Sequence, residues 1–237
     1  MRKNIFAIAT VAAGILGVAS VGAQAADMPL KAPRMPVAAY YNWTGFYIGI
    51  NGGYGWGTSS WWDDPSLTGA DFGSHSFNGG MVGGQIGYNY QISTFVLGID
   101  ADLDWADLNG SHTNPFGNLL NTKATSLGSV TGRLGYANGQ SLLFAKGGLA
   151  WGTFQYDNFL PGGALNGSNS STRTGWTIGG GYEYGFAANW SVKVEYDYMD
   201  FGRKRLAFTS GAGGAFVQDI TDSIHVVKAG VNYRFNP

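Results

Sequence analysis

Hydrophobic and polar residues alternate along most of this chain with a period of two, the pattern of β-strands that have one apolar face. The clearest run spans about 94–107. Its apolar face carries Phe95, Leu97, Ile99, Ala101, Leu103 and Trp105, and its polar face carries Gly98, Asp100, Asp102 and Asp104. Similar runs begin at Trp43 and recur near 77–90, 123–137, 140–156, 172–186, 190–201 and 222–235. The pattern therefore predicts eight strands.

The connections between these runs alternate in length. Short turns are expected near Gln91–Ser93, at Asn138-Gly139 and near Ala187–Asn189, and Asn-Gly is a strong two-residue hairpin signal. Four longer loops are expected near 58–76, 108–122, 157–171 and 202–221. This alternation is typical of outer-membrane barrels, which have tight periplasmic turns and long extracellular loops. We expect an all-β fold: an eight-stranded antiparallel up-and-down transmembrane β-barrel with both termini periplasmic.

A soluble barrel or sandwich is the alternative, and it would bury the apolar faces. Runs of 12 to 15 residues are long for soluble strands, which usually have about five or six residues. Aromatic residues also gather at both ends of the runs, as they do at the two membrane interfaces. We expect Trp43, Tyr88, Trp190, Tyr233 and Phe235 at the short-turn interface, and Trp56, Trp105, Trp151 and Trp176 at the other. A membrane sheet must close into a barrel, because lipid leaves unpaired backbone groups unsatisfied.

The composition excludes several other classes of protein. The 237 residues include 39 glycines, 14 Phe, 8 Trp and 13 Tyr, but only 12% are charged. Disordered chains lack aromatic residues, and coiled coils lack glycine. The formal charge of −1 gives no basic excess for binding nucleic acid, so no nucleic-acid partner is expected. The absence of cysteine excludes a disulfide scaffold and any thiolate metal site.

The first residues have the pattern of a secretory signal. Arg2 and Lys3 precede an apolar stretch from Ile5 to Ala19, and Ala23-Gln24-Ala25 is a small-x-small cleavage pattern. The following segment contains Pro29, Pro33 and Pro36, which disfavour ladder pairing. We expect a cleaved signal peptide at 1–25, a proline-containing periplasmic lead-in at 26–42 and an outer-membrane barrel domain at 43–237.

The polar faces carry the charged residues that would point into the barrel. The acids are Asp100, Asp102, Asp104, Glu183, Glu195 and Asp197, and the bases are Arg133, Lys146, Arg173, Lys193, Lys228 and Arg234. The turns predict that Glu183 lies opposite Lys193, Thr131 opposite Lys146, and Glu195 opposite Lys228. Because unpaired buried charges cost several kcal/mol each, we expect a paired network that fills the lumen. Inward glycines, among them Gly53, Gly83 and Gly147, leave an open pore as the alternative.

Candidate chemistry is sparse. Three consecutive inward carboxylates, Asp100, Asp102 and Asp104, lie about 7 Å apart along a strand, which favours charge balance over cation binding. The histidines are His75, His112 and His225, with serines nearby, but the sequence gives no convergent set of nucleophile, base and orienting group. We therefore expect no enzyme activity, no metal and no cofactor.

Four segments have a distinctive sequence: Tyr41–Gly49 (YNWTGFYIG), Leu143–Trp151 (LFAKGGLAW), Lys193–Tyr198 (KVEYDY) and Val227–Phe235 (VKAGVNYRF). Together they resemble the RopB-like outer-membrane immunogenic proteins of alphaproteobacteria. The resemblance implies an eight-stranded, porin-like barrel of the OmpA transmembrane type in a Gram-negative outer membrane. It also implies that Phe235 is the terminal aromatic read by the barrel-assembly machinery, although Asn236-Pro237 follows it here.

Three functions fit these observations. The first is a structural barrel that stabilises the envelope, exposes surface loops, and has outer-membrane lipid, lipopolysaccharide and the assembly machinery as partners. The second is a narrow porin for small solutes. The third is an adhesin that contacts host molecules through its loops.

Overall fold

The computed structural model describes residues 41–63, 69–210 and 215–235. The predicted signal peptide at 1–25 and residues 26–40 of the predicted lead-in lie outside these residues. The described part of the chain contains no helix that is long and apolar enough to cross a membrane.

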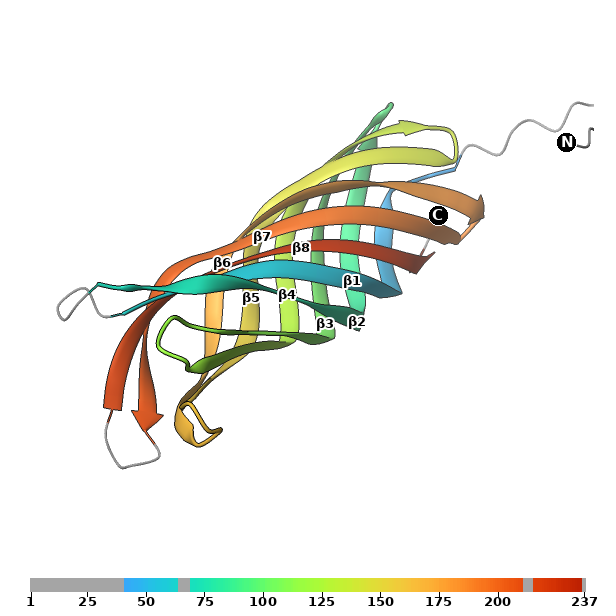
Figure 1. The fold of residues 1–237 in the computed structure, drawn as a ribbon. Coiled ribbons are helices and arrows are strands. Elements are labelled where there is room, and N and C mark those ends of the chain that lie inside the picture. Colours follow the sequence, from blue (N-terminus) through green and yellow to red (C-terminus); the bar gives the residue numbers. More distant parts are fainter. Residues whose placement is uncertain (1–40, 64–68, 211–214, 236–237) are drawn as a thin grey trace, which may run out of the picture. The chain divides into compact units, whose positions relative to one another are not determined.

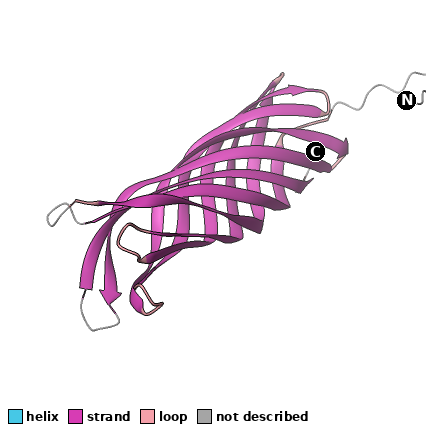
Figure 2. Ribbon diagram, in the orientation of Figure 1, coloured by secondary structure: helices cyan, strands magenta, loops and turns pink. Residues whose placement is uncertain are grey.

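Eight antiparallel strands form one closed barrel, which confirms the predicted fold (Figures 1 and 2). The strands are β1 (Gly45–Asp63), β2 (Asp71–Ile92), β3 (Phe95–Thr113), β4 (Leu119–Asn138), β5 (Ser141–Phe159), β6 (Leu165–Ala187), β7 (Trp190–Ser210) and β8 (Ala215–Arg234). Each strand pairs with its neighbours in sequence, and β1 pairs with β8 to close the ring, from Tyr47 opposite Arg234 to Asp63 opposite Gln218. The closed ring leaves no free sheet edge along its paired length.

Three tight turns lie at one end of the barrel, the turn end, where β1 begins and β8 ends. The predicted Asn138-Gly139 turn is wrong by one residue, because Asn138 is the last ladder residue and pairs with Ser141. The turn residues are therefore Gly139 and Gln140. Gly139 has a φ of 59°, the left-handed conformation that glycine adopts without strain.

The four predicted long loops are largely strand. The connection from β3 to β4 is only Asn114–Asn118, and that from β5 to β6 is Leu160–Ala164. The strands continue because the apolar face changes sides toward the far end, the loop end. In β5, Leu143 and Leu149 point outward, whereas Phe154 and Tyr156 point inward and Gln155 points outward. The sequence there looked polar and loop-like because its outward face is polar.

Between the two ends, the outer wall is an apolar band and the interior is charged. Ile50, Leu103 and Leu149 are 72%, 51% and 69% exposed on the outside. Arg133, Lys146 and Asp102 are only 3–4% exposed. This arrangement is the reverse of a water-soluble barrel or sandwich.

Candidate functional site

The interior of the barrel holds every charged residue that the sequence placed there, and their side chains form successive layers. At the turn end, an apolar cluster closes the interior. It consists of Tyr41, Trp43, Val96, Ala137, Leu142 and Phe144.

Trp43 belongs to this cluster, so its predicted place at a membrane interface is wrong. Its side chain is fully buried, and its ring lies 4.5 Å from that of Tyr41. The Arg234 guanidinium lies 5.1 Å from the centre of the Trp43 ring and donates a 2.7 Å hydrogen bond to the Trp43 carbonyl. Trp43 precedes β1, so the alternation of the strand did not fix the direction of its side chain.

Glu183 is the acceptor of the next layer. Arg133 donates to it at 2.9 Å, Ser191 at 2.6 Å and Asn232 at 2.9 Å. Arg234 lies 3.7 Å from the same carboxylate. The Arg133 guanidinium also packs 3.9 Å from the centre of the Phe144 ring, which joins this layer to the apolar cluster.

Lysines and carboxylates fill the middle of the barrel. Lys146 lies 3.2 Å from Asp197, 3.3 Å from Glu195, 3.8 Å from Asp102 and 4.0 Å from Asp100. Lys228 pairs with Asp102 and lies 3.2 Å from Asp104, 3.4 Å from Glu195 and 3.9 Å from Asp197. Lys193 pairs with Glu195 at 2.9 Å. Each of the two central lysines therefore contacts four carboxylates.

The predicted registers hold in two of three cases. Glu183 lies opposite Lys193, and Glu195 lies opposite Lys228. Thr131 does not lie opposite Lys146, because the displaced turn puts Arg133 there. A residue that lies directly opposite on the neighbouring strand is not always the ionic partner. Glu183 pairs with Arg133 across the interior, from β6 to β4.

A further ion pair lies near the loop end. Arg173 pairs with Asp222, and Tyr156 donates a hydrogen bond to the same carboxylate. Arg173 also donates to the backbone carbonyls of Phe201 and Ile220, at 3.2 and 3.1 Å. The sequence interpretation missed Asp222. It lies six residues before Lys228 on the predicted eighth strand, so the period of two could have placed it inside.

Beyond the charged layers, a second apolar cluster fills the loop end. It includes Trp61, Phe77, Met81, Leu108, Leu120, Leu127, Phe154, Tyr156, Met199, Phe201, Leu206, Phe208, Ile220 and Ile224. Several of these rings stack or meet edge to face, for example Phe154 with Phe201 at 5.1 Å. The charged layers are thus enclosed by apolar packing on both sides.

Inward glycines make room for these long side chains. A Cβ at Gly53 would lie 2.9 Å from the Lys228 side chain, and one at Gly83 would collide with the Asp104 carboxylate. Since side chains already occupy these positions, the glycines do not leave an open pore there. Gly147 lies on the outward face, which corrects its predicted place in the interior.

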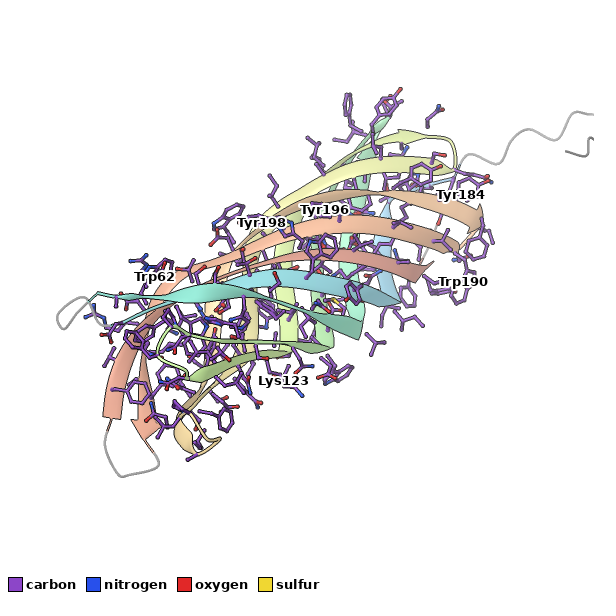
Figure 3. The ribbon with its side chains drawn as sticks, in the orientation of Figure 1. Trp62, Lys123, Tyr184, Trp190, Tyr196 and Tyr198 are labelled. Atoms are coloured by element: carbon purple, nitrogen blue, oxygen red, sulfur yellow. The ribbon has the colours of Figure 1, made fainter. Side chains whose placement is uncertain are left out.

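The other predicted interface aromatics lie on the outer wall. Trp56, Trp105, Trp176, Trp190 and Phe235 are 41–71% exposed, and Tyr88, Trp151 and Tyr233 are half-buried. Trp190 and Tyr184 lie near the turn end, and Tyr196 and Tyr198 lie farther along the wall (Figure 3). The Phe235 amide donates to the Phe46 carbonyl at 2.8 Å, which fixes the end of β8 against β1.

The histidines form no catalytic constellation. His75 and His112 contact each other through their Nδ1 atoms at 2.8 Å near the loop end. His225 is on the outer wall, where its ring stacks on Trp56 and contacts the Tyr196 hydroxyl. In the described residues, no group of three or more His, Cys, Asp or Glu side chains could hold a metal ion.

Comparison with known proteins fits this geometry. Residues 12–235 match the outer membrane protein beta-barrel domain. The chain belongs to this outer-membrane β-barrel family. The 31 kDa outer-membrane immunogenic protein of Brucella melitensis biotype 1 is 34% identical over 243 residues, covering 95% of this chain and 98% of its own. The 22 kDa outer membrane protein of Rhizobium leguminosarum bv. viciae is 31% identical over 237 residues, covering 99% and 97%.

Among solved structures, the outer membrane protein OprG of Pseudomonas aeruginosa is similar to 82% of this chain and 97% of its own, with a TM-score of 0.47 and 16% identity. The sequence relatives confirm the resemblance to outer-membrane immunogenic proteins of alphaproteobacteria. This β-barrel therefore resides in the outer membrane of a Gram-negative bacterium, with its apolar band facing lipid.

The central lysines can be tested by removing one charge. In this outer-membrane barrel, Lys228→Met removes a cation from four buried carboxylates. Among the described residues, Asp104 has no other ion pair, and the other three carboxylates keep only Lys146 or Lys193. We expect the free energy of unfolding to fall by about 3–5 kcal/mol, the usual effect of breaking a buried ion pair. Urea unfolding from lipid vesicles measures this change. Lys123→Met is the matched control, because its 3.0 Å pair with Asp107 is exposed and should contribute less than about 1 kcal/mol. Equal effects of the two variants would contradict the network.

The histidine pair predicts a pH effect at the loop end, beyond the apolar band. Burial, together with the neighbouring His112, lowers the pKa of His75 from 6.5 to about 4. The unfolded chain therefore binds this proton more readily than the folded barrel, and stability should decrease as the pH falls from 6.5 toward 4. An NMR titration of the His75 ring, assigned with a His75→Asn variant, measures the midpoint. A midpoint at or above 6.5 would contradict the buried placement.

Proposed function

We propose that this outer-membrane barrel is a non-conducting structural protein that stabilises the envelope and exposes its hairpins at the cell surface. In this proposal the turn end is periplasmic and the loop end faces outward. Residues 1–25 are the cleaved signal peptide, residues 26–42 the periplasmic lead-in, and residues 43–237 the barrel domain. Phe235 is the terminal aromatic that the assembly machinery reads.

The observation that carries this proposal is the filled interior. The side chains of the predicted lumen charges are only 0–4% exposed. In a water-filled channel, such side chains would be hydrated and therefore exposed. Eight strands enclose a space that side chains are just able to fill. Here two apolar clusters and the ionic layers between them occupy it.

A narrow porin would need a continuous polar path past both apolar clusters. At the turn end, Trp43, Leu142 and Phe144 are 0–4% exposed. At the loop end, Phe77, Leu108 and Phe154 are fully buried. Passage of ions would therefore require rearrangement of tightly packed aromatic and aliphatic side chains, which favours a closed barrel.

Planar bilayer recording of the refolded protein tests this closure. We expect no steady conductance, because an apolar cluster lies at each end of the ionic layers in the described residues. Heat-modifiable gel mobility of the same sample establishes that the barrel has folded. Discrete channels whose ion selectivity changes in Asp102→Asn or Lys146→Gln would overturn the proposal in favour of a porin.

The envelope role is tested by complementation of a deletion strain. We expect deletion to increase sensitivity to detergent and leakage of periplasmic enzymes. The wild-type gene should restore the barrier, and so should a variant in which Asn114–Asn118 and Leu160–Ala164 are replaced by two-residue turns. A trimmed variant that folds at normal abundance but fails to restore the barrier would contradict a role carried by the barrel itself.

A further inference from the structure

The described residues include ten lysines and arginines, and their distribution is uneven. Six are buried in the interior: Arg133, Lys146, Arg173, Lys193, Lys228 and Arg234. The other four reach the surface, and three of those are the consecutive residues Arg203, Lys204 and Arg205 on β7. We call these three residues the basic run. The fourth, Lys123, is paired with Asp107.

The basic run begins directly after an irregularity in β7. Gly202 has a φ of 60°, and the pairing with β8 shifts between Asp200 and Arg203. Tyr198, an aromatic residue of the outer wall, lies five positions earlier. At about 3.3 Å per residue and a strand tilt of about 35–45°, Arg203 lies about 12–14 Å beyond Tyr198 along the barrel axis. Arginine and lysine side chains can reach back toward the membrane surface from this distance.

The outer wall orients the first arginine. The Arg203 guanidinium lies 4.4 Å from the centre of the Trp62 ring, which belongs to β1. Trp62 lies beside Asp219 of β8, and Asp219 lies beside Arg205, whose Nε donates to its carboxylate at 3.2 Å. Trp62 is on the same outer wall as Tyr196 and Tyr198, farther toward the loop end (Figure 3). Stacking on an indole leaves the edge of a guanidinium able to donate to an anion.

Lys204 completes the basic run. Its Nζ donates to the Thr172 carbonyl of β6 at 3.3 Å, and an ammonium group has three donors. In the described part of the chain, no carboxylate lies within ion-pair distance of Arg203 or Lys204. Arg205, by contrast, has Asp219 as an ionic partner, so Arg203 and Lys204 carry the excess positive charge of the basic run.

We propose that the basic run binds the anionic headgroup of an outer-leaflet glycolipid, with Arg203 as the oriented donor and Lys204 and Arg205 beside it. The position favours a lipid over a soluble polyanion, because the run lies on the wall just past the aromatic residues and not at a hairpin tip. Arginine forms bidentate hydrogen bonds with phosphate or carboxylate groups, so either headgroup chemistry fits. The inference rests on the outer-membrane location and does not require a closed lumen.

Binding of diphosphoryl lipid A to the refolded barrel in phosphatidylcholine nanodiscs tests this site, with bound lipid counted by native mass spectrometry. Each neutralised residue should weaken binding about fivefold, and the triple variant Arg203→Gln, Lys204→Gln, Arg205→Gln about a hundredfold. Lys123→Gln removes the fourth surface cation of the described residues and should leave binding unchanged. Arg203→Lys should fall between wild type and Arg203→Gln, since it keeps the charge but loses the planar fork.

Gel mobility establishes that each variant has folded. The proposal is overturned if the triple variant binds lipid A as tightly as wild type, or if Lys123→Gln weakens binding equally. A parallel titration with heparin in lipid-free detergent separates the alternative source. Loss of heparin binding in the triple variant with unchanged lipid A binding would assign the run to a soluble polyanion and would also overturn the proposal.

Discussion

Charges enclosed by a hydrogen-bonded wall must find their partners inside the barrel, and this constraint organises the structure. The ring of eight paired strands satisfies most of the backbone, apart from an interruption between β6 and β7 from Ser168 to Trp176, and encloses the charged layers. Lys146 and Lys228 then have to be neutralised from within, which explains why carboxylates from β3 and β7 converge on both of them. Glycines on the wall follow from the same constraint, because a Cβ at Gly53 or Gly83 would displace the ionic side chains.

The barrel carries two opposite polarity patterns along the same strands. Within the apolar band, hydrophobic side chains point outward and ions point inward. Beyond it, apolar side chains such as Phe154 and Leu108 point inward, as in a soluble protein. This reversal follows from the change of solvent along the strand, from lipid to water. It lets the strands continue well past the apolar band, and it closes the charged layers with a dry apolar cluster.

The sequence was sufficient to predict the strand number, the order of the strands and twelve of the inward charges, although not Asp222, because a period of two assigns faces wherever one face is apolar. It failed where that signal changed. The sequence predicts loops where the strands extend past the apolar band, because the outward-facing residues there are polar. Trp43 lies just before β1, where alternation no longer fixes direction, and the displaced Gly139-Gln140 turn moved Lys146 from Thr131 to Arg133. Arg133, the ionic partner of Glu183, lies across the interior on a strand that is not adjacent to β6. The alternation within one strand cannot predict such a contact.

The most direct test uses two consecutive residues of β4 that point to opposite sides. Ser129 is 1% exposed in the interior, and Val130 is 49% exposed on the outer wall. Because the chain has no cysteine, Ser129→Cys and Val130→Cys each provide a single reactive thiol. In the folded barrel in lipid, the thiol at 130 should react with a lipid-phase reagent. The thiol at 129 should resist both lipid-phase and water-soluble reagents until urea unfolds the protein. Rapid reaction of the thiol at 129 with a water-soluble reagent in the folded barrel would contradict a filled, closed interior.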